Sequence, residues 1–314
     1  MPLFSLEDLA TADAVVRTLV PPTPAYAWPL LAKRTGVHVV VKHENHTPTG
    51  SFKARGGLTY VAALQRSMKL PKGLITATRG NHGQSVAIGA GRAGVPALIV
   101  VPEGNSSEKN AAMEAFGGEL MIAGRDFDES RAIARHLEAE KDFQFVPSFH
   151  RDIVIGVATY ARELFTDHPD LDAVYAPIGM GSGICGLVTV RDLLGLKTEI
   201  IGVVSDHAPA FALSFEAGRP VFTETARTFA DGIACREPQA EPLEIIHKGV
   251  SRLVRVTDDE IADAMRIFYV DTHNISEGAG AAALAGLIKE RSGIRGRRVA
   301  VSYTHLTLPT ILRV

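Results

Sequence analysis

Cysteine is scarce in this chain: only Cys185 and Cys235 are present, too few for a disulfide framework. The chain also lacks an excess of charge of one sign, because 33 basic residues stand against 35 acidic ones and the formal net charge is −2. Such a balance creates no field that would attract nucleic acid or an anionic surface. We therefore expect a reducing, cytoplasmic location and no nucleic-acid partner.

Long hydrophobic runs are absent as well. The apolar runs have the length of strands rather than of membrane-spanning helices, so we expect no membrane partner. The N-terminal segment, MPLFSLEDLATADAVV, carries Glu7, Asp8 and Asp13 and lacks a cationic start followed by an apolar core. It is therefore not expected to be a secretory signal peptide.

What the chain does contain is a regular alternation of short β-rich runs with longer segments of helical period. The runs lie at 37–44, 73–78, 97–102, 119–124, 173–179, 199–205 and 298–302. The alternation predicts βαβ units and open parallel sheets whose strands can be apolar throughout, because helices cover both faces. The predicted fold class is α/β. No linker is evident, so a second domain would form where the chain leaves one sheet and returns to it.

Three glycine-containing loops each follow a predicted strand, and such strand ends are where open α/β sheets place ligands. The first loop, HENHTPTGSFKARGG at 43–57, turns before a helix begins and carries Lys53. The backbone N–H groups of a helix start, together with a lysine, suit an anion. A lysine in isolation is more often a solvated surface residue. The apolar neighbours Phe52 and Ala54 favour partial burial instead, which would lower the amine's pKa and make it a nucleophile.

The second loop, TRGNHGQSVA at 78–87, enters a helix, and Gly80 and Gly83 allow its backbone to approach a ligand closely. Asn81 can donate and accept at one place, which fits a phenolate or carboxylate oxygen. An asparagine that caps a helix would explain the same pattern equally well. His82 is a candidate acid or base, although a buried structural histidine is the commoner case.

The third loop, GMGSGICG at 179–186, opens a helix and can surround a phosphate with main-chain N–H groups. Its spacing is not the dinucleotide pattern, and no suitably placed acidic residue could hold a ribose, so a single phosphate is favoured. Glycines at such turns also occur for packing alone. Cys185 is expected to be small buried filler, because no histidine that could activate a thiol is evident nearby.

Together and in this order, the loops resemble those of the fold-type II pyridoxal-phosphate enzymes, above all the threonine/serine dehydratase and serine racemase branch. The likeness covers about residues 15–301. Its most specific piece is PTGSFKARG at 48–56, which resembles the family's Schiff-base segment with Lys53 as the cofactor lysine. GNHGQ at 80–84 resembles the loop whose asparagine, here Asn81, binds the 3′-oxygen of the cofactor.

Three further segments match in the same order. GMGSGICG resembles the family's phosphate cup, and TFADGIACREP at 228–238 resembles its DGIA-type segment. EGAGAAALA at 277–285 resembles the element that places a glutamate, here Glu277, near the cofactor ring. The resemblance implies a two-domain, tryptophan synthase β-like architecture with pyridoxal 5'-phosphate in the cleft. The large cofactor-binding domain would comprise 1–54 and 146–314, and the small inserted domain 55–145.

The resemblance also implies roles for individual residues. Lys53 would carry the cofactor and act as the general base at the substrate's Cα. The residues expected to contact the cofactor are Phe52, Lys53, Asn81, Gly179, Met180, Gly181, Ser182, Gly183, Glu277 and Thr304. Those expected to hold the amino acid substrate are Ser51, Thr78, Gly80, Asn81 and His82.

The expected activity is that of an ammonia-lyase or dehydratase. It would convert a β-hydroxy-α-amino acid of the threonine/serine type, with phenylserine as a further candidate, to a 2-oxo acid and ammonia. The alternatives are an amino acid racemase, a β-replacement enzyme of the same fold and a non-catalytic cofactor-binding protein. The expected partners are a small amino acid substrate and a second copy of the chain in a homodimer.

Three departures from the family limit what can be carried over. Arg79 stands where dehydratases and racemases commonly have serine, which disfavours racemisation. Val204 stands where the divalent-cation site of serine racemases has glutamate, and Asp206 alone is a weak site, so we expect no metal. The segment SYTHLTLPTILRV at 302–314 replaces the family's SGGN turn, and counting along it puts Thr304 at the hydroxyl partner of the ring nitrogen.

Overall fold

The computed structural model describes residues 2–68 and 70–303, and their contacts divide the chain into two compact units. Unit 1 comprises residues 1–6, 22–52 and 158–314, and unit 2 comprises residues 7–21 and 53–157. After an early passage through unit 2 at residues 7–21, the chain enters unit 2 again at the peptide bond between Phe52 and Lys53. Helix α7 (Arg151–Asp167) contains the return passage.

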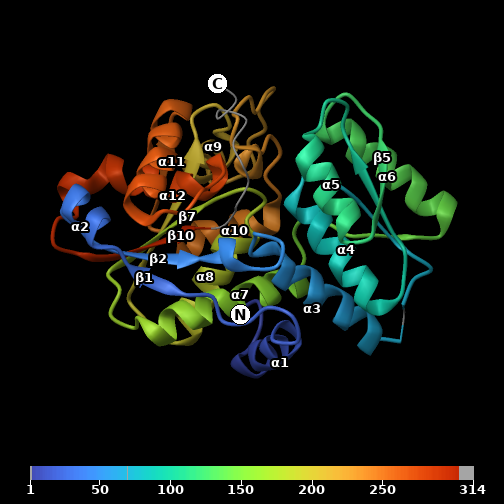
Figure 1. Ribbon diagram of the computed structural model, residues 1–314, viewed down its shortest axis with the longest axis horizontal. Coiled ribbons are helices and arrows are strands. Elements are labelled where there is room, and N and C mark those ends of the chain that lie inside the picture. Colours follow the sequence, from blue (N-terminus) through green and yellow to red (C-terminus); the bar gives the residue numbers. More distant parts are fainter. Residues whose placement is uncertain (1, 69, 304–314) are drawn as a thin grey trace. The chain divides into compact units, whose positions relative to one another are not determined.

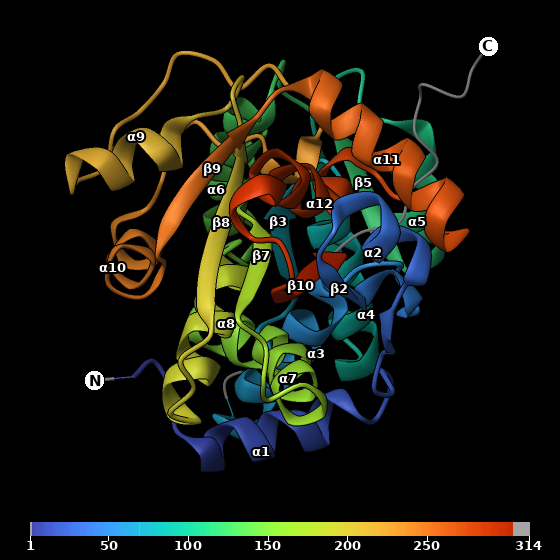
Figure 2. The same ribbon diagram turned by 90° about the vertical axis from the view of Figure 1, so that its left-hand side faces the viewer.

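Unit 1 contains a six-stranded sheet in the order β1-β2-β10-β7-β8-β9. All neighbouring strands are parallel except β1 and β2, which are antiparallel. Figure 1 labels β1, β2, β10 and β7 of this sheet, and Figure 2 shows β7, β8 and β9 side by side. The bounds are β1 (Ala25–Ala27), β2 (His38–His43), β7 (Ala173–Pro177), β8 (Glu199–Ser205), β9 (Arg252–Val256) and β10 (Arg298–Tyr303).

Helices cover both faces of this sheet, as its nearly continuous apolar strands require. A Cβ at Gly286 of α12 would lie 2.7 Å from Val203, whereas a Cβ at Gly202 would lie 3.1 Å from Ile184 of α8. Because successive strand residues point to opposite faces, α12 and α8 pack on opposite sides of β8. The helices are α2 (Pro29–Thr35), α8 (Ser182–Leu193), α9 (Ala210–Ala217), α10 (Ala240–Gly249), α11 (Asp258–Thr272) and α12 (Gly278–Glu290), with the short 3₁₀ turns η1 (Glu44–His46), η2 (Asp231–Ile233) and η3 (Arg291–Gly293).

Unit 2 contains a four-stranded parallel sheet in the order β5-β4-β3-β6. Its strands are β3 (Leu74–Ala77), β4 (Ala97–Val101), β5 (Gly118–Ile122) and β6 (Gln144–Phe145). Its helices are α1 (Leu6–Val16), which starts at the unit boundary, α3 (Lys53–Arg66), α4 (Asn81–Ala93), α5 (Ser107–Ala115) and α6 (Phe127–Lys141). One core of this unit lies between β3, β4 and α6.

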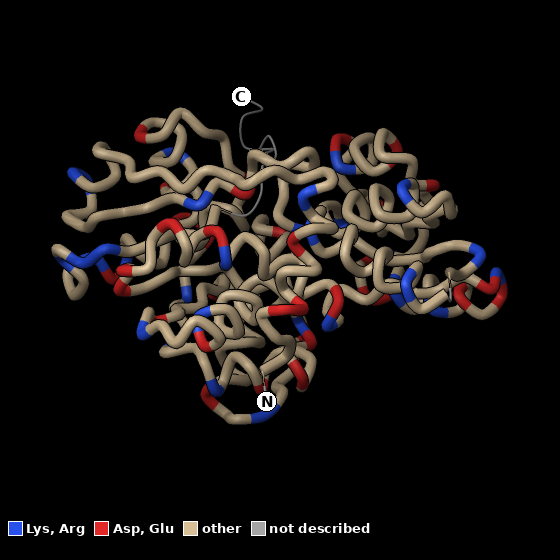
Figure 3. The backbone as a smooth tube through the Cα atoms, turned by 90° about the horizontal axis from the view of Figure 1, so that it is seen from below, with Lys and Arg blue, Asp and Glu red and all other residues tan. Residues whose placement is uncertain are grey.

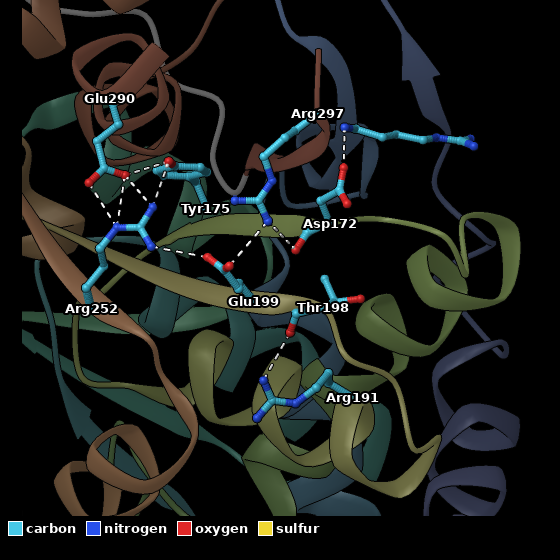
Figure 4. A network of polar contacts seen from close by, with 9 residues as sticks. Asp172, Tyr175, Arg191, Thr198, Glu199, Arg252, Glu290 and Arg297 are labelled. Carbon is cyan, nitrogen blue, oxygen red and sulfur yellow. Dashed lines mark hydrogen bonds and ion pairs between the residues drawn. The ribbon is translucent and has the colours of Figure 1, made fainter. Parts of the chain in front are cut away.

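A polar network ties together the amino ends of the unit 1 strands (Figure 4). Arg252 at the start of β9 donates to Glu290 (2.8 Å) and Glu199 (3.2 Å), and Tyr175 on β7 also donates to Glu290 (2.6 Å). Burial raises the pKa of the Tyr175 phenol, so it remains a hydrogen-bond donor. Arg297 adds a bond to Glu199 (3.3 Å). This network occupies the amino edge and leaves the carboxyl edge of the sheet to the glycine loops.

Every strand predicted from the sequence is present, and the α/β fold class with parallel-rich sheets is confirmed. The limits of the two compact units differ from the predicted domain limits: residues 7–21 join unit 2, and the boundaries fall at 52/53 and 157/158. A division by contacts does not test a division by function, so the predicted domains stay a prediction.

Charges of both signs are interspersed along the described backbone (Figure 3). This distribution agrees with the near-neutral composition. Within the residues that the structure describes, no helix is both long enough and apolar enough to cross a membrane.

Candidate active site

The turn before Lys53 is held by its own hydroxyl groups. Thr47 accepts the Ser51 N–H (2.8 Å) and donates to the Ser51 carbonyl (2.9 Å), and Thr49 donates to the same carbonyl (3.1 Å). Gly50 has φ +62°, a left-handed conformation that only glycine adopts at little cost. Ser51 is fully buried as a result. The sequence therefore fixes locally the segment that leads to the lysine.

Phe52 connects this turn to the predicted phosphate loop within unit 1. Its ring packs edge-on against Tyr160, with 6.1 Å between ring centroids. A Cβ at Gly183 would lie 3.7 Å from the Phe52 ring, an ordinary contact distance. Two of the sequence-predicted loops thus meet in unit 1, and Lys53 follows one peptide bond later.

The loop after β7 forms a cradle of glycines at the start of α8. The first hydrogen bond of α8 runs from the Cys185 N–H to the Gly181 carbonyl (3.0 Å), so the N–H groups of residues 182–184 precede the helix's own ladder. Gly181 has φ +97°, and a Cβ at Gly179 would lie 2.2 Å from the Gly232 carbonyl oxygen. A side chain is therefore disfavoured at both Gly179 and Gly181. This leaves the N–H donors at the start of α8, a 12-residue helix, open to an anion. These residues fit the phosphate group of the cofactor.

Cys185 is buried in α8, directly after the residues of this cradle, and the structure gives its thiol no chemical role there. The thiol is fully buried, and burial raises its pKa far above the ordinary value. A thiol that stays protonated is a poor nucleophile. The geometry supports the expectation that Cys185 is buried filler.

The segment 228–233 backs the same cradle. Asp258, at the first position of α11, accepts hydrogen bonds from the Thr228 hydroxyl (2.6 Å) and the Phe229 N–H (3.3 Å). A Cβ at Gly278 would lie 2.7 Å from the Phe229 ring, so this segment also lies against the start of α12. Glu277, the N-cap residue of α12, is 7% exposed. The sequence analysis missed Asp258, because nothing in its own surroundings marks it as a partner of a segment about thirty residues earlier.

A directed chain of hydrogen bonds runs from Trp28 to Asn274, which lies three residues before Glu277. Trp28 Nε1 donates to His43 Nε2 (3.0 Å), so the His43 proton resides on Nδ1, where Asn45 Oδ1 accepts it (3.2 Å). Asn45 in turn donates to Asn274 Oδ1 (3.2 Å). Burial lowers the pKa of His43 to about 4, which keeps the ring neutral and the direction of the chain fixed. These residues also escaped the sequence analysis, since only the fold brings them together.

Unit 2 holds Lys53 and the second predicted loop in one body. Lys53 is the half-buried first residue of α3, and its carbonyl accepts a hydrogen bond from the Ser85 hydroxyl of α4 (2.6 Å). The helices can come this close because of a glycine pair: a Cβ at Gly57 would lie 2.1 Å from the Ser85 carbonyl, and one at Gly89 would lie 2.7 Å from the Gly57 carbonyl. Lys53 is therefore brought to the amino end of α4.

The loop before α4 offers donors at that helix start. The Gly80 N–H donates to the Thr78 hydroxyl oxygen (3.0 Å), so the hydroxyl proton remains able to serve a ligand. Asn81 begins α4 and accepts a hydrogen bond from Gln84 (3.3 Å). Arg79 between them is exposed. The predicted substrate residues of this loop are thus gathered at one helix end.

His82 differs from its neighbours in this loop. Its ring is buried, and Nε2 faces the Val146 carbonyl at 3.3 Å. Burial, with a smaller contribution from the charge of Lys53, lowers its pKa to about 4. A neutral, enclosed imidazole supports the structural interpretation of His82 over a direct acid–base role. Its assignment to the substrate stays a prediction.

Two expectations concern parts of the site that the structure does not decide. Thr304 lies outside the described residues. Among the described residues, no group of three or more histidine, cysteine, aspartate or glutamate side chains could hold a metal ion. The expectation that no metal is required stays a prediction.

The sequence profile of one protein family, described as Pyridoxal-phosphate dependent enzyme, matches residues 16–304. The chain belongs to this family. Its membership confirms the predicted resemblance and the predicted cofactor. Two features of the structure agree with this membership: Lys53 stands at the start of a helix, and the glycine cradle before α8 can accommodate a phosphate.

Individual relatives are similar over most of the chain. An L-threonine ammonia-lyase of Thermotoga maritima is 31% identical over 300 residues, which are 95% of this chain and 74% of the relative. An L-threonine dehydratase of Pasteurella multocida is 34% identical over 268 residues, 85% of this chain but 52% of the relative. The chain thus spans about half the length of several curated relatives that it matches.

Solved structures show the same fold. A threonine deaminase from T.th. has a TM-score of 0.89 and 30% identity, with 96% of this chain and 98% of that chain covered. The processed form of threonine deaminase isoform 2 from Solanum lycopersicum has a TM-score of 0.91 and 29% identity, with 97% and 85% covered. Maize serine racemase, at 22% identity and a TM-score of 0.91, shares the fold.

Proposed function

We propose that this chain is a pyridoxal-phosphate-dependent lyase that converts a β-hydroxy-α-amino acid of the threonine/serine type to a 2-oxo acid and ammonia. The observation that carries the proposal is the position of residues 52 and 53. Phe52 lies beside Gly183 of the phosphate cradle, and the Lys53 backbone is bonded to Ser85 at the amino end of α4. Relatives named threonine ammonia-lyase or dehydratase support this reaction class.

When bound, pyridoxal phosphate supplies an electron sink for the bonds at the substrate's Cα. The N–H groups of residues 182–184 would hold its phosphate at the start of α8. The Lys53 amine would carry the cofactor at rest, and during turnover it would take the Cα proton, since its backbone is anchored by Ser85. By resemblance, Asn81 would hold the ring oxygen and Glu277 would lie near the ring.

The substrate's own groups match donors on the α4 side. The Thr78 hydroxyl and the N–H groups at the start of α4 can donate to an α-carboxylate, which is best bound by several such donors. With the carboxylate held there, the Cα proton and the β-hydroxyl would leave together as one water molecule, and hydrolysis of the released enamine by one water molecule would give the 2-oxo acid and ammonia. The overall change releases one ammonia for each 2-oxo acid.

We further propose a cytoplasmic location and a homodimer. Cys185 and Cys235 are both buried, and neither forms a disulfide, a usage typical of a reducing compartment.

The decisive experiment adds serine, threonine, phenylserine and hydroxyaspartate separately to the cofactor-loaded chain and measures 2-oxo acid and ammonia. We expect equal amounts of the two products from at least one of these substrates. Racemised amino acid without 2-oxo acid would favour a racemase, and product only with an added nucleophile would favour β-replacement. A cofactor absorbance band with no product from any substrate would leave a non-catalytic binding protein.

A lysine substitution tests the assignment of residue 53. Lys53→Ala should abolish turnover and the visible band of the lysine-bound cofactor. Lys72→Ala is the matched control, because Lys72 is an exposed lysine of the same unit, paired only with exposed Asp142 in the described ion pairs. After borohydride reduction, mass spectrometry should locate the cofactor on Lys53. An adduct on any other lysine would refute the assignment.

A further inference from the structure

Helix α5 packs against the start of α4 within unit 2 (Figure 1). A Cβ at Gly83 would lie 2.3 Å from the Met113 sulfur of α5, and a Cβ at Gly80 would lie 2.8 Å from Cδ of Lys109. Lys109 and Met113 are four residues apart and therefore lie on one side of α5. The glycines at 80 and 83 leave room for these two side chains, so α5 places a lysine beside the loop that leads into α4.

The first turn of α5 fixes the position of Lys109. The Ser106 hydroxyl, at the N-cap, accepts the Lys109 N–H (3.3 Å). From there, Cγ, Cδ and Cε of Lys109 lie 3.4, 2.8 and 3.6 Å from a Cβ at Gly80. The aliphatic stem thus runs past Gly80, with the ammonium one bond beyond Cε. Glu108, the neighbour of Lys109 in the sequence, accepts hydrogen bonds from the hydroxyls of Ser106 (2.8 Å) and Ser107 (3.3 Å).

Arg79 brings a second cationic side chain to the same loop. It is exposed, and it lies between Thr78, whose hydroxyl accepts the Gly80 N–H, and Gly80 itself. Lys53 adds a third cation, because its charge contributes, after burial, to the lowered pKa of His82. Cationic side chains from α3, from α5 and from the loop are thus gathered at the amino end of α4, which is also the positive end of the helix dipole.

This positive charge exceeds what the proposed reaction uses at this helix end. The cofactor's phosphate is assigned to the start of α8 in unit 1, and Lys53 is assigned to the cofactor. A substrate such as threonine has one carboxylate, for which the Thr78 hydroxyl and the N–H groups of α4 are suitable donors. Arg79 and Lys109 are assigned to neither group. Guanidinium and ammonium groups are the side chains that bind carboxylates most strongly, so the pair suits a second carboxylate.

We propose that Arg79 and Lys109 form a second carboxylate subsite, and that the substrate is a β-hydroxy amino acid with a carboxylate on its β-carbon, such as 3-hydroxyaspartate. The inference rests on the proposed function and deepens it. The two carboxylates of such a substrate are attached to adjacent carbon atoms. With one at the start of α4, the other would lie close to the residues that flank Gly80.

The reaction itself stays that of the proposed lyase. The Cα proton and the β-hydroxyl leave as one water molecule, and hydrolysis of the enamine consumes one water molecule. The products are a 2-oxo diacid and one ammonia, and both carboxylates remain intact. Arg79, which stands where a serine is common in the family, gains a role, because its planar fork can bind a carboxylate through two parallel hydrogen bonds. Phenylserine offers these cations no partner and should be a poorer substrate.

Substrate preference of the cofactor-loaded full chain tests the subsite. The kcat/KM for the best isomer of 3-hydroxyaspartate should exceed that for threonine by at least about tenfold, and Arg79→Ser should lower this ratio roughly 10- to 100-fold. Lys109→Met, which keeps the aliphatic stem over Gly80, should act in the same direction, and Arg79→Lys should restore part of the loss. Arg92→Ser is the matched control, because Arg92 is an exposed arginine in the last turn of the same helix. If Lys109→Met does not fold, the exposed position 79 decides the question.

Binding without turnover separates this inference from the proposed reaction. Aspartate and asparagine differ in the charge of the β-substituent and lack a β-hydroxyl, and their binding can be followed by the absorbance of the lysine-bound cofactor. Aspartate should bind at least about tenfold more tightly than asparagine, and added salt and Arg79→Ser should each reduce the difference.

The outcomes distinguish the two proposals. Formation of 2-oxo acid from threonine, with aspartate bound no better than asparagine, would overturn the subsite and leave the lyase intact. Tighter binding of aspartate that depends on Arg79, with no product from any substrate, would support the subsite and refute the lyase. A loss of preference in Arg92→Ser as large as in Arg79→Ser would also overturn the subsite, because the effect would then not be local.

Discussion

The glycine cradle allows a sharp steric prediction. A Cβ at Gly179 would lie 2.2 Å from the carbonyl oxygen of Gly232, more than 1 Å inside ordinary contact, and the obstacle is backbone that cannot rotate away. At Gly183, four residues on, a Cβ would meet only the Phe52 ring and the Tyr160 hydroxyl, both at 3.7 Å. Gly179→Ala should therefore displace the loop or the segment 228–233, whereas Gly183→Ala should fit.

Overpacking of this kind typically costs about 1–3 kcal/mol. Because the strain falls on the loop that holds the phosphate, we expect it to appear in cofactor affinity, and each 1.4 kcal/mol is about tenfold in Kd. Gly179→Ala should bind pyridoxal phosphate roughly 10- to 100-fold more weakly than the wild type. Gly183→Ala should stay within about tenfold, since its Cβ meets no obstacle.

The assay is a titration of the chain with pyridoxal phosphate, followed by the absorbance of the lysine-bound cofactor, together with the melting temperature of each form. Gly91→Ala is a control for the general effect of replacing glycine, because its Cβ would meet nothing within 4 Å. If Gly179→Ala bound the cofactor as tightly as Gly183→Ala and melted at the same temperature, the steric reasoning about the cradle would be wrong.

Three other outcomes follow from the described contacts. The pKa of His82 is about 4 when folded and 6.5 when unfolded, so the unfolded chain binds more protons between these values. Stability should fall as pH drops from 6.5 to 4, by about 1.4 kcal/mol per pKa unit, and urea titrations of His82→Gln should show a shallower fall. Arg252→Met should lower the free energy of unfolding by about 1–3 kcal/mol, because it leaves Glu290 without its arginine, while kcat/KM should be unchanged since the network is at the amino edge. Activity should survive a chelator, and a large loss restored by Mg²⁺ would show that Asp206 has metal-binding partners.

The strands that the sequence predicted share a simple cause. Each is a short apolar run bounded by turn residues, and most are buried on both faces, so pattern alone identifies them. The strands that were missed lack that pattern. β1 is three residues long with Tyr26 and Ala27 exposed, and β9 carries Arg252 and Arg255 among its apolar residues. Their place in the sheet is set by the strand beside them.

The position of the glycine loops was predictable from the sequence, but the steric role of each glycine in them was not. Spacing after a strand marks 179–186 as a loop that can hold an anion, and glycine is used there for several reasons. Only the packing distinguishes Gly179, which faces the Gly232 backbone, from Gly183, which faces side chains at ordinary distance. The role of Gly57 is of the same kind, since its obstacle is the Ser85 backbone of another helix.

The sequence by itself determined the parallel α/β class, the order of the loops and the chemical groups that each loop carries, because turn residues and apolar periodicity act through neighbouring residues along the chain. Only the tertiary structure decided which groups meet. Asp258 holds the segment at 228–229, Ser85 anchors Lys53, and burial lowers the pKa of His82 to about 4. These effects depend on residues far apart in sequence, and a local pattern contains no information about which distant backbone or carboxylate packing brings within hydrogen-bonding distance.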